Sequence, residues 1–522
     1  MIRSTFSGFN TAQLALMASQ RALDVTGQNL SNINTPGYTR QRLDVMSLNP
    51  VGNSIGSSEY DAKVGQGVMM VGVSQIRDPF LDIQYRNEVP KLGTVDAKNS
   101  ILESIGNIFD ESDTEAIRTR LSSIVSQLTN LATPENAGSN SADALVRSAC
   151  EVFLDNVHQN GASIKNVRAE LTEKMGRSVV PELNTYLTEI VNLNVSIRNS
   201  QILGNPALEL QDQRNDMLDE LATYMPIEVT YNKKDMGGGI VVDTLDVNLR
   251  TTDGNKVSLI SDDKKGSFEF VSTDNNGNAV FPVKLMATGV DAAAAVDVTD
   301  KMSNGILKGN LDMLNKSETY DDPENDVKGI GYYEKTFDLF VNKFATMMNS
   351  LNSIDGSGTD APLFTTNDGN TTGFTASNIR VSEQWITGDV KITLSKDADA
   401  GSTDYKNVLE MINALSADDI QFSQMVGGAD KPIFKGTFFE FYDNIQNTQA
   451  IERQAAMSLL KNHQTVADQV AECRDAISGV NMDEEVMDLM RFSQSYNAAS
   501  RLMTTMDEIL ERLIVNTGVV GR

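Results

Sequence analysis

Apolar residues recur every seven positions at both ends of this 522-residue chain, and this pattern constrains the fold more than any other feature. Over about residues 3–30 the stripe consists of Ile2, Phe9, Leu16, Leu23 and Leu30, and Phe6 widens it. Near the other end it consists of Met482, Leu489, Tyr496, Met503 and Leu510, with Phe492, Ala499, Met506 and Leu513 three positions after four of them. The spacing predicts two helices with coiled-coil seams. Because a lone helix is held mainly by packing, both helices need partners.

The charges of the two ends favour their pairing with each other. Residues 1–42 contain four arginines and one aspartate, whereas residues 481–522 contain four arginines and seven acidic residues. Exposed ion pairs contribute only about 0 to 1 kcal/mol each, so burial of the stripes must supply the affinity. The alternative is that each terminal helix docks on its own domain. Against it, the first 30 residues carry mostly uncharged polar residues between stripe positions, as expected if several faces contact other chains.

The overall composition excludes several classes of partner. The chain has 44 basic and 71 acidic side chains, a formal charge of −27, which repels phosphate backbones and anionic membranes. We therefore expect neither nucleic acid nor membrane as a partner. Polar residues interrupt the first 20 positions where a signal peptide needs an apolar run, and no stretch of about 18 apolar residues follows. These features predict a chain made as a soluble cytoplasmic protein without a cleaved signal peptide.

The interior is mostly helical in pattern. Apolar spacing of three and four residues predicts long helices over 92–131, 141–202, 206–224, 333–351 and 438–477. The repeat at Phe337, Phe340, Val341, Phe344, Met347 and Met348 is typical of a core-facing helix. In the last of these helices, Leu459, His463, Val466, Val470, Cys473 and Ile477 share one face, which we expect to pack in the core.

One interior stretch has the period of a β-sheet. Leu245, Val247 and Leu249 alternate with polar residues, and Asp253-Gly254 and Asn276-Gly277 are hairpin-type turns. We therefore predict a mainly α fold with paired terminal helices, a core of long helices and an inserted outer β domain. The predicted domains are 1–60 with 481–522 as a terminal coiled coil, 61–230 with 301–480 as the helical core, and 231–300 as the β domain. A Gly/Asp/Thr-rich, loop-rich stretch at 355–400 lies within the core domain, and its part up to about residue 375 reads as a surface loop.

Candidate chemical sites have simpler structural explanations. His158 lies one turn from Glu151 and Asp155, but one histidine with two carboxylates usually forms a solvated helix face rather than a metal site. Cys150 and Cys473 are far apart in sequence and predict no disulfide framework. The sequence around Gly237–Gly239 lacks the lysine of a phosphate loop and fits a strand-entry turn. Asp483, Glu484 and Glu485 open a helix, where acidic residues favour the macrodipole, and they lack the spacing of a calcium loop. We expect no catalytic, cofactor or metal site.

Four motifs carry a resemblance to a known family. NLSNINTPGY at 29–38, directly after the N-terminal helix, resembles the signature of the rod, hook and hook-associated axial proteins of the bacterial flagellum. SGVNMDEEVMDLMRFSQSYNAASRLM at 478–503 is similar to their C-terminal helix in its hook-associated form. LELQDQRNDMLDELATY at 208–224 and NGILKGNLDMLN at 304–315 resemble the helical core of members at the hook-filament junction. The resemblance does not cover about 231–300 or 355–400.

The resemblance implies a structural, non-enzymatic subunit that polymerises at the hook tip and joins hook to filament. It implies a tubular homo-oligomer with the terminal coiled coil lining the inner tube and the β domain facing outward. Its neighbours would be the hook protein below and a second junction protein above, and a cytoplasmic export chaperone would guard the C-terminal helix. Secretion to the flagellum would use the flagellar type III apparatus. Two alternatives are another axial subunit, such as the hook protein or the neighbouring junction protein, and an exported enzyme or adhesin for which flagellar ends serve as an export address.

The candidate assembly residues follow from the stripes and the signature motif. Pro36, Gly37 and Tyr38 would set the turn that leads the chain outward from the N-terminal helix. The complete set is Ile2, Phe6, Phe9, Leu16, Leu23, Leu30, Asn32, Asn34, Pro36, Gly37, Tyr38, Met482, Leu489, Phe492, Tyr496, Met503, Met506, Leu510 and Leu513.

Overall fold

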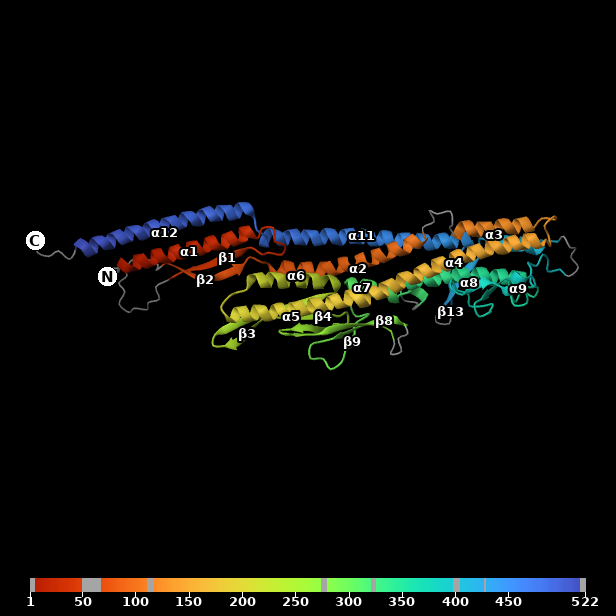
Figure 1. The fold of residues 1–522 in the computed structure, drawn as a ribbon, viewed down its shortest axis with the longest axis horizontal. Coiled ribbons are helices and arrows are strands. Elements are labelled where there is room, and N and C mark those ends of the chain that lie inside the picture. Colours follow the sequence, from red (N-terminus) through yellow and green to blue (C-terminus); the bar gives the residue numbers. More distant parts are fainter. Residues whose placement is uncertain are drawn as a thin grey trace, which may run out of the picture.

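The molecule is an elongated stack of long helices, and the first and the last helix of the described chain lie together at one extremity (Figure 1). The structure, a computed structural model, describes residues 5–48, 67–109, 117–273, 279–320, 325–397, 404–426 and 429–516. Among these residues, no helix combines the length and the apolar character needed to cross a membrane.

The two terminal helices pair side by side, as predicted. α1 (Thr5–Ser31) and α12 (Met482–Asn516) run in opposite directions, because Gly8 lies against Met506 at one end of the pair and Asn29 against Glu485 at the other. Beside α1 the chain forms an antiparallel ribbon of β1 (Gln41–Ser47) and β2 (Val68–Gln75). Figure 1 shows this terminal unit extending beyond the rest of the molecule.

The core is built from long helices that pack along one another (Figure 1). Its longer helices are α2 (Pro79–Phe109), α3 (Ile117–Leu131), α4 (Asn140–Lys174), α5 (Val180–Ile202), α6 (Leu208–Tyr224), α8 (Ile330–Asn352) and α11 (Phe438–Ser478). Shorter elements are α7 (Ile306–Asn315), the 3-10 turn Glu318–Tyr320, α10 (Lys406–Ser416) and the hairpin β12 (Gln421–Val426) and β13 (Ala429–Lys435). A π-helical turn, Met175–Val179, joins α4 to α5, so the helical path continues from one helix into the next. The predicted helical core is thereby confirmed.

Aromatic side chains fill the centre of this core. Phe340 of α8 packs edge-on against Phe438 of α11, with ring centroids 5.7 Å apart. Phe422 of β12 stacks on Phe441 at 4.0 Å. All four rings are fully buried, so burial of these aromatic rings ties α8, α11 and the β12–β13 hairpin together.

The strands of the interior stretch form two antiparallel sheets. One has the order β3 (Ile227–Gly237), β4 (Ile240–Arg250), β5 (Lys256–Ser261) and β6 (Lys264–Lys265), and the other β7 (Ser267–Thr273), β8 (Ala279–Thr288) and β9 (Val296–Asp297). Gly254 takes a φ of 79° in the β4–β5 turn, whereas Asn276-Gly277 lies outside the described residues. Val247, Leu249 and Leu285 are buried in the same hydrophobic core as the helices. The sheets therefore cover one side of the helical layer, and the division into three domains stays a prediction.

The glycine-rich segment after β3 is a hairpin turn rather than a strand entry. Gly237, Gly238 and Gly239 all have positive φ values, and the residues on either side of them pair as β3 and β4. Three successive left-handed positions need glycine, which explains the run.

Two sequence predictions about the core are wrong. The stretch up to residue 375 is not all surface, because Phe364 and Phe374 are buried. Asn349 of α8 holds the backbone of this segment, donating to Phe364 O and accepting from Phe364 N at 2.8 and 2.9 Å. Polar composition misled the prediction because one buried amide satisfies backbone groups that water would otherwise solvate. Short elements follow: β10 (Phe364–Thr366), β11 (Ile379–Val381) and α9 (Glu383–Thr387).

The second error concerns the predicted inner face of α11. Leu459, Val466, Cys473 and Ile477 are exposed, while Ala456 and Ala467 are buried. His463 lies at the α2 boundary, where its Nδ1 is 2.6 Å from Glu88 Oε1. The second half of α11 therefore buries alanines, which let helices approach closely, whereas its first half buries Phe438, Phe441, Tyr442 and Ile445.

Candidate assembly site at the terminal helices

The seam between the terminal helices is formed by large side chains on α12 and small ones on α1. Ala499 of α12 is buried, and its half-buried neighbours on the seam are Phe492, Tyr496, Met503, Met506 and Leu510. On α1, Ala12 and Ala22 are buried. A Cβ atom added at Gly8 would lie 2.2 Å from the Met506 Cε atom, so the absence of a side chain at Gly8 makes room for the methionine.

The predicted α1 stripe is only partly used in this seam. Phe9, Leu16, Leu23 and Leu30 are half-buried, while Ile2 and the side chains of Phe6 and Leu513 lie outside the described residues. A second heptad series on α1, Gly8, Ala12, Ala15, Ser19, Ala22, Thr26 and Asn29, is also buried or half-buried and contains the buried residues Ala12, Ala22, Thr26 and Asn29, while Ala18 and Val25 are buried outside it. Sequence reasoning missed this series because it sought large apolar residues; a search for small residues at spacings of four and three would have found it.

A buried carboxylate connects α1 and α12 at the end of the pair where α1 finishes and α12 begins. Glu485 of α12 is 1% exposed and accepts from Arg40 Nε at 2.6 Å and from Asn29 Nδ2 at 3.1 Å. Asn29 Oδ1 in turn accepts from the Tyr38 hydroxyl at 2.9 Å and from Gln41 N at 3.0 Å. We call Asn29, Tyr38, Arg40, Gln41 and Glu485 the polar knot. It connects α12 to the end of α1 and the start of β1, so both termini share one set of charge-assisted hydrogen bonds.

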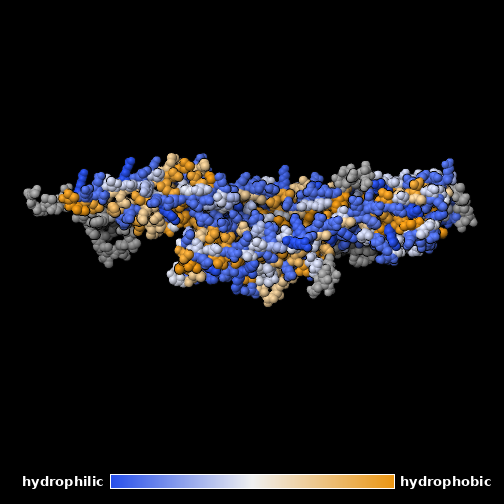
Figure 2. All heavy atoms as spheres, viewed as in Figure 1, coloured by the Kyte–Doolittle hydropathy of each residue, from blue (hydrophilic) through white to orange (hydrophobic). Residues whose placement is uncertain are grey.

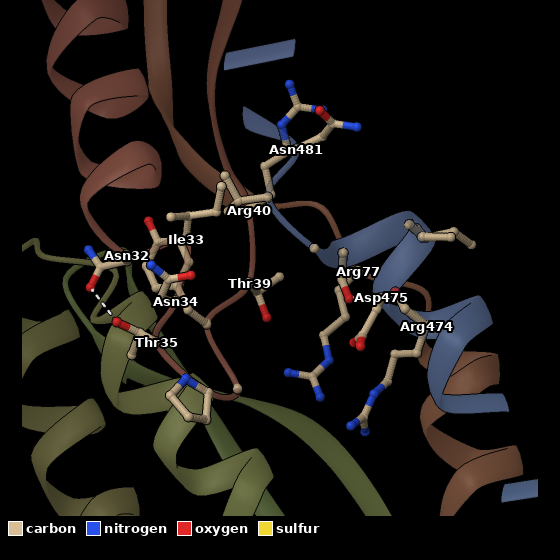
Figure 3. A pocket seen from close by; sticks show the side chains of 18 of the residues that line it. Asn32, Ile33, Asn34, Thr35, Thr39, Arg40, Arg77, Arg474, Asp475 and Asn481 are labelled. Atoms are coloured by element: carbon tan, nitrogen blue, oxygen red, sulfur yellow. Dashed lines mark hydrogen bonds between the residues drawn. The ribbon is translucent and has the colours of Figure 1, made fainter. Parts of the chain in front are cut away.

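The signature motif before the knot forms an exposed turn. Thr35 donates to Asn32 Oδ1 at 3.2 Å, the contact drawn in Figure 3. Asn34 and Pro36 are exposed, and Asn32 is half-buried. These residues border a cavity of about 760 Å³, into which the side chains of Arg77 and Arg474 point (Figure 3).

The end of the turn rests on α6. Gly37 has a φ of 73°, and a Cβ atom there would lie 2.0 Å from Asp216 Oδ2, so both the backbone conformation and the space require glycine. Thr39 N donates to Asp212 Oδ2 at 3.0 Å. Burial first, and then the carboxylates of α6, raise the pKa of Tyr38 above its ordinary value. The motif therefore acts as the joint between the terminal unit and the core.

Arginine–carboxylate pairs continue this joint into the core helices. Arg77 binds Asp82 at 2.6 Å, while Arg86 and Arg474 bind the two oxygens of Asp219 at 2.6 and 2.5 Å. These contacts connect α2, α6 and α11 directly behind the turn. Most of these side chains are at least half-buried. The ion pairs therefore hold the terminal unit in one orientation relative to the core more firmly than exposed ion pairs would.

The first turns of α12 carry an apolar patch that faces solvent. Met482, Val486, Met487, Leu489 and Met490 are all exposed. Figure 2 shows an orange area over the end of α12 that lies nearest to α11. The predicted residues Met482 and Leu489 therefore lie outside the α1–α12 seam, on a surface that a single chain does not cover. Contiguous exposed patches of this kind mark interaction sites.

His158, considered above as part of a possible metal site on α4, is half-buried. His158 Nε2 is 2.7 Å from the Ile379 carbonyl oxygen, an acceptor, so this nitrogen donates. Among the described residues, no group of three histidine, cysteine or carboxylate side chains could hold a metal ion. Cys150 is buried, which raises the pKa of its thiol, and Cys473 is exposed.

Three family models match the chain in the order of its elements. The model described as "Flagellar hook-associated protein FlgK helical domain" matches residues 102–364. A flagella basal body rod protein model matches residues 9–39, and the C-terminal model of the rod FlgEFG proteins matches 475–516. The two rod matches cover the terminal helices, and the helical-domain match covers half of the chain.

Full-length relatives and a solved structure agree with these matches. The chain is 28% identical to flagellar hook-associated protein 1 of Bacillus subtilis, over 99% of this chain and all of the relative. It is 24% identical to flagellar hook-associated protein 1 of Escherichia coli, over 97% and 98%. The flagellar hook junction protein FlgK of Burkholderia pseudomallei has a similar fold, with a TM-score of 0.55 and 11% identity over 76% of this chain and all of that one. This chain belongs to the flagellar hook-associated protein 1 (FlgK) family, whose members are structural proteins of the bacterial flagellum and not enzymes.

Proposed function

We propose that this chain is a structural subunit of the junction between the flagellar hook and the filament and that it polymerises through its terminal helix pair. The observation that carries the proposal is the distribution of apolar surface on α12. One stripe is covered by α1, whereas the patch from Met482 to Met490 faces solvent in the single chain. Burial of such a patch between copies would supply the affinity that the charges, at about 0 to 1 kcal/mol per exposed pair, do not.

The remaining assembly residues have matching roles in this proposal. The polar knot and the turn at Asn32, Asn34, Pro36, Gly37 and Tyr38 set the direction in which the helix pair leaves the core. The half-buried residues Phe9, Leu16, Leu23 and Leu30 of α1 offer a second apolar edge to neighbouring copies. In a tube of many copies the pair would line the inside and the sheets β3–β9 would lie outside, which corresponds to the three predicted domains.

The same surface indicates the partners. We propose hook protein below the tube, a second junction protein above it, and a cytoplasmic export chaperone that covers α12 before assembly. By binding α12, a chaperone would cover the exposed apolar patch until the helix reaches the growing tube. The proposed location is the flagellum outside the cell, reached by flagellar type III export without a cleaved signal peptide. The match of residues 102–364 to the FlgK helical domain favours this subunit over other axial proteins.

The test uses methionine-to-aspartate variants in a strain that lacks the gene for this protein. Met490 is 52% exposed and Met236, in the β3 strand, is 46% exposed, so neither substitution disturbs a buried side chain. We expect Met490→Asp to give hooks without filaments by electron microscopy, with flagellin lost to the medium. Met236→Asp is the matched control and should give normal filaments.

A second variant tests the seam between the terminal helices. Met503→Asp places a charge against α1 and should block assembly while circular dichroism shows an intact helical core. Leu23→Asp places a charge on the second apolar edge of α1 and should also block assembly. Normal filaments with Met490→Asp and Met503→Asp, at normal levels of exported protein, would refute the assignment of assembly to the terminal helices.

A further inference from the structure

An apolar cavity lies between α1, α12 and the β1–β2 ribbon. Its volume is about 480 Å³, within the range of about 300–1,000 Å³ that is typical of ligand pockets. Small and branched apolar side chains form most of its wall: Ala18, Ala22 and Val25 of α1, Leu43 and Val45 of β1, and Val68 of β2. The three α1 residues are buried, whereas Val45 is 52% exposed. The cavity therefore has a closed floor on α1 and an open side at the ribbon.

The exposed patch of α12 and this cavity lie on opposite sides of the helix. The patch includes Met482 and Met490, about two turns apart. The cavity is lined by Asp488, Arg491 and Ser495 of the same helix. At 3.6 residues per turn, the two sets of side chains point about 170° apart. One chain therefore cannot place its own patch in its own cavity.

The charges favour a second copy of this chain as the occupant of the cavity. Arg42 of β1 and Arg491 of α12 line the cavity and are exposed. Each has one carboxylate neighbour, Asp44 at 3.3 Å and Asp488 at 3.0 Å. Asp483, beside the patch, is exposed, and its side chain has no ion pair among the described residues. A patch with this carboxylate repels another patch of the same kind but is attracted by the two arginines.

We propose that the exposed α12 patch of one copy docks into the cavity between α1, α12 and the ribbon of the next copy. This inference rests on the proposed function and specifies the two surfaces that meet when the chain polymerises. The patch contributes flexible methionine side chains, which fill irregular apolar gaps well.

The contact is heterologous, because the patch and the cavity are different surfaces. Each docked copy keeps one surface free for a further neighbour, so a row of such contacts closes into a ring or continues as a helix. Contact between two like patches would be two-fold symmetric and would end at a dimer. Only the heterologous contact accounts for a tube of many copies.

The test is cysteine cross-linking of the full chain in a strain that lacks its gene. Cys473 is exposed, so every variant also carries Cys473→Ser. One cysteine replaces Met490 on the patch. The second replaces, in turn, Val45, Val68 or Ser495 around the cavity, because a disulfide needs Cβ atoms about 3.5–4.5 Å apart. Isolated flagella are oxidised with copper phenanthroline, and the chain is detected by immunoblot on a non-reducing gel.

We expect a ladder of dimers, trimers and larger products from at least one of the three cysteine pairs, since each docked copy is linked to the next. Met490→Cys alone and Val45→Cys alone should stay monomeric. The matched control combines Val45→Cys with Met236→Cys on β3, where the wild-type side chain is 46% exposed, and it should also stay monomeric. All of these substitutions retain small apolar side chains, so filaments should form normally before oxidation.

Four results would overturn the docking. Dimers from Met490→Cys alone would show that two patches face each other. A ladder from the control pair would show that linkage does not depend on the patch. No ladder from any of the three pairs, with normal filaments, would show that the copies meet through other surfaces, and the assembly function would still stand. Absence of the wild-type chain from isolated flagella would refute the assembly function and the docking together.

Discussion

Replacement of Glu485 by alanine should detach the base of the terminal helix pair while the core stays folded. Glu485 is the buried centre of the polar knot, where it accepts from Arg40 and Asn29. Its neighbour Glu484 binds the same arginine at 2.6 Å, but it is 54% exposed. The two residues have the same type, lie in the same helix turn and share one partner, so they form a matched pair that differs in burial.

The magnitude can be worked from these contacts. Loss of one partner from a buried ion pair costs about 3 to 5 kcal/mol, because the remaining charge is left unpaired. Arg40 keeps Glu484 at 2.6 Å and Asp488 at 3.6 Å, and Asn29 keeps its bond to the Gln41 carbonyl. The cost should therefore fall to about 2 to 3 kcal/mol, near the range for hydrogen bonds to charged groups. Glu484→Ala should cost about 0 to 1 kcal/mol.

Amide hydrogen exchange on the single chain measures this difference directly. A cost of 2 to 3 kcal/mol corresponds to roughly 30- to 150-fold more frequent opening, which should appear in peptides from the second half of α1 and the first half of α12. Peptides from α8 and from the first half of α11 should exchange as in the wild type. Equal effects of Glu485→Ala and Glu484→Ala would show that burial of Glu485 has no special role and would refute the reasoning.

Two further substitutions test the core. Phe441→Ala removes a fully buried ring that stacks on Phe422 at 4.0 Å. It should lower the free energy of unfolding, measured by urea titration, by about 3 to 5 kcal/mol and leave amide exchange in α12 unchanged. A loss below about 1 kcal/mol would contradict the packing. Asp338 has its pKa raised to about 6, mainly by burial, so the wild type should lose stability as this group ionises between about pH 4 and pH 6. Asp338→Asn should reduce the difference in unfolding free energy between pH 5 and pH 7 by about 1 kcal/mol, and an unchanged difference would argue against a buried, protonated carboxyl group.

The joint between terminal unit and core illustrates how much of the site the sequence predicted. The turn at Pro36-Gly37-Tyr38 was expected from local chemistry, because proline stops a helix and glycine permits a left-handed conformation. The polar knot was not expected, because Asn29 and Glu485 are 456 positions apart and each is an ordinary polar residue by itself. Burial makes their hydrogen bond a specific connection between α1 and α12. Neither local segment shows that the two side chains are buried.

The sequence by itself determined most of the long helices, the alternating strand residues between about 245 and 270, and the α12 stripe that includes Phe492, Tyr496 and Ala499, because spacings of 3.6 and 2 are local properties of the backbone. Only the tertiary structure decided which face each helix buries. Gly8 of α1 makes room for Met506 of α12, and Gly106 of α2 lies against Gln449 of α11, since the distance between two helix axes depends on both partners at once. The same holds for Glu485, whose hydrogen bonds depend on the neighbours that distant segments bring to it.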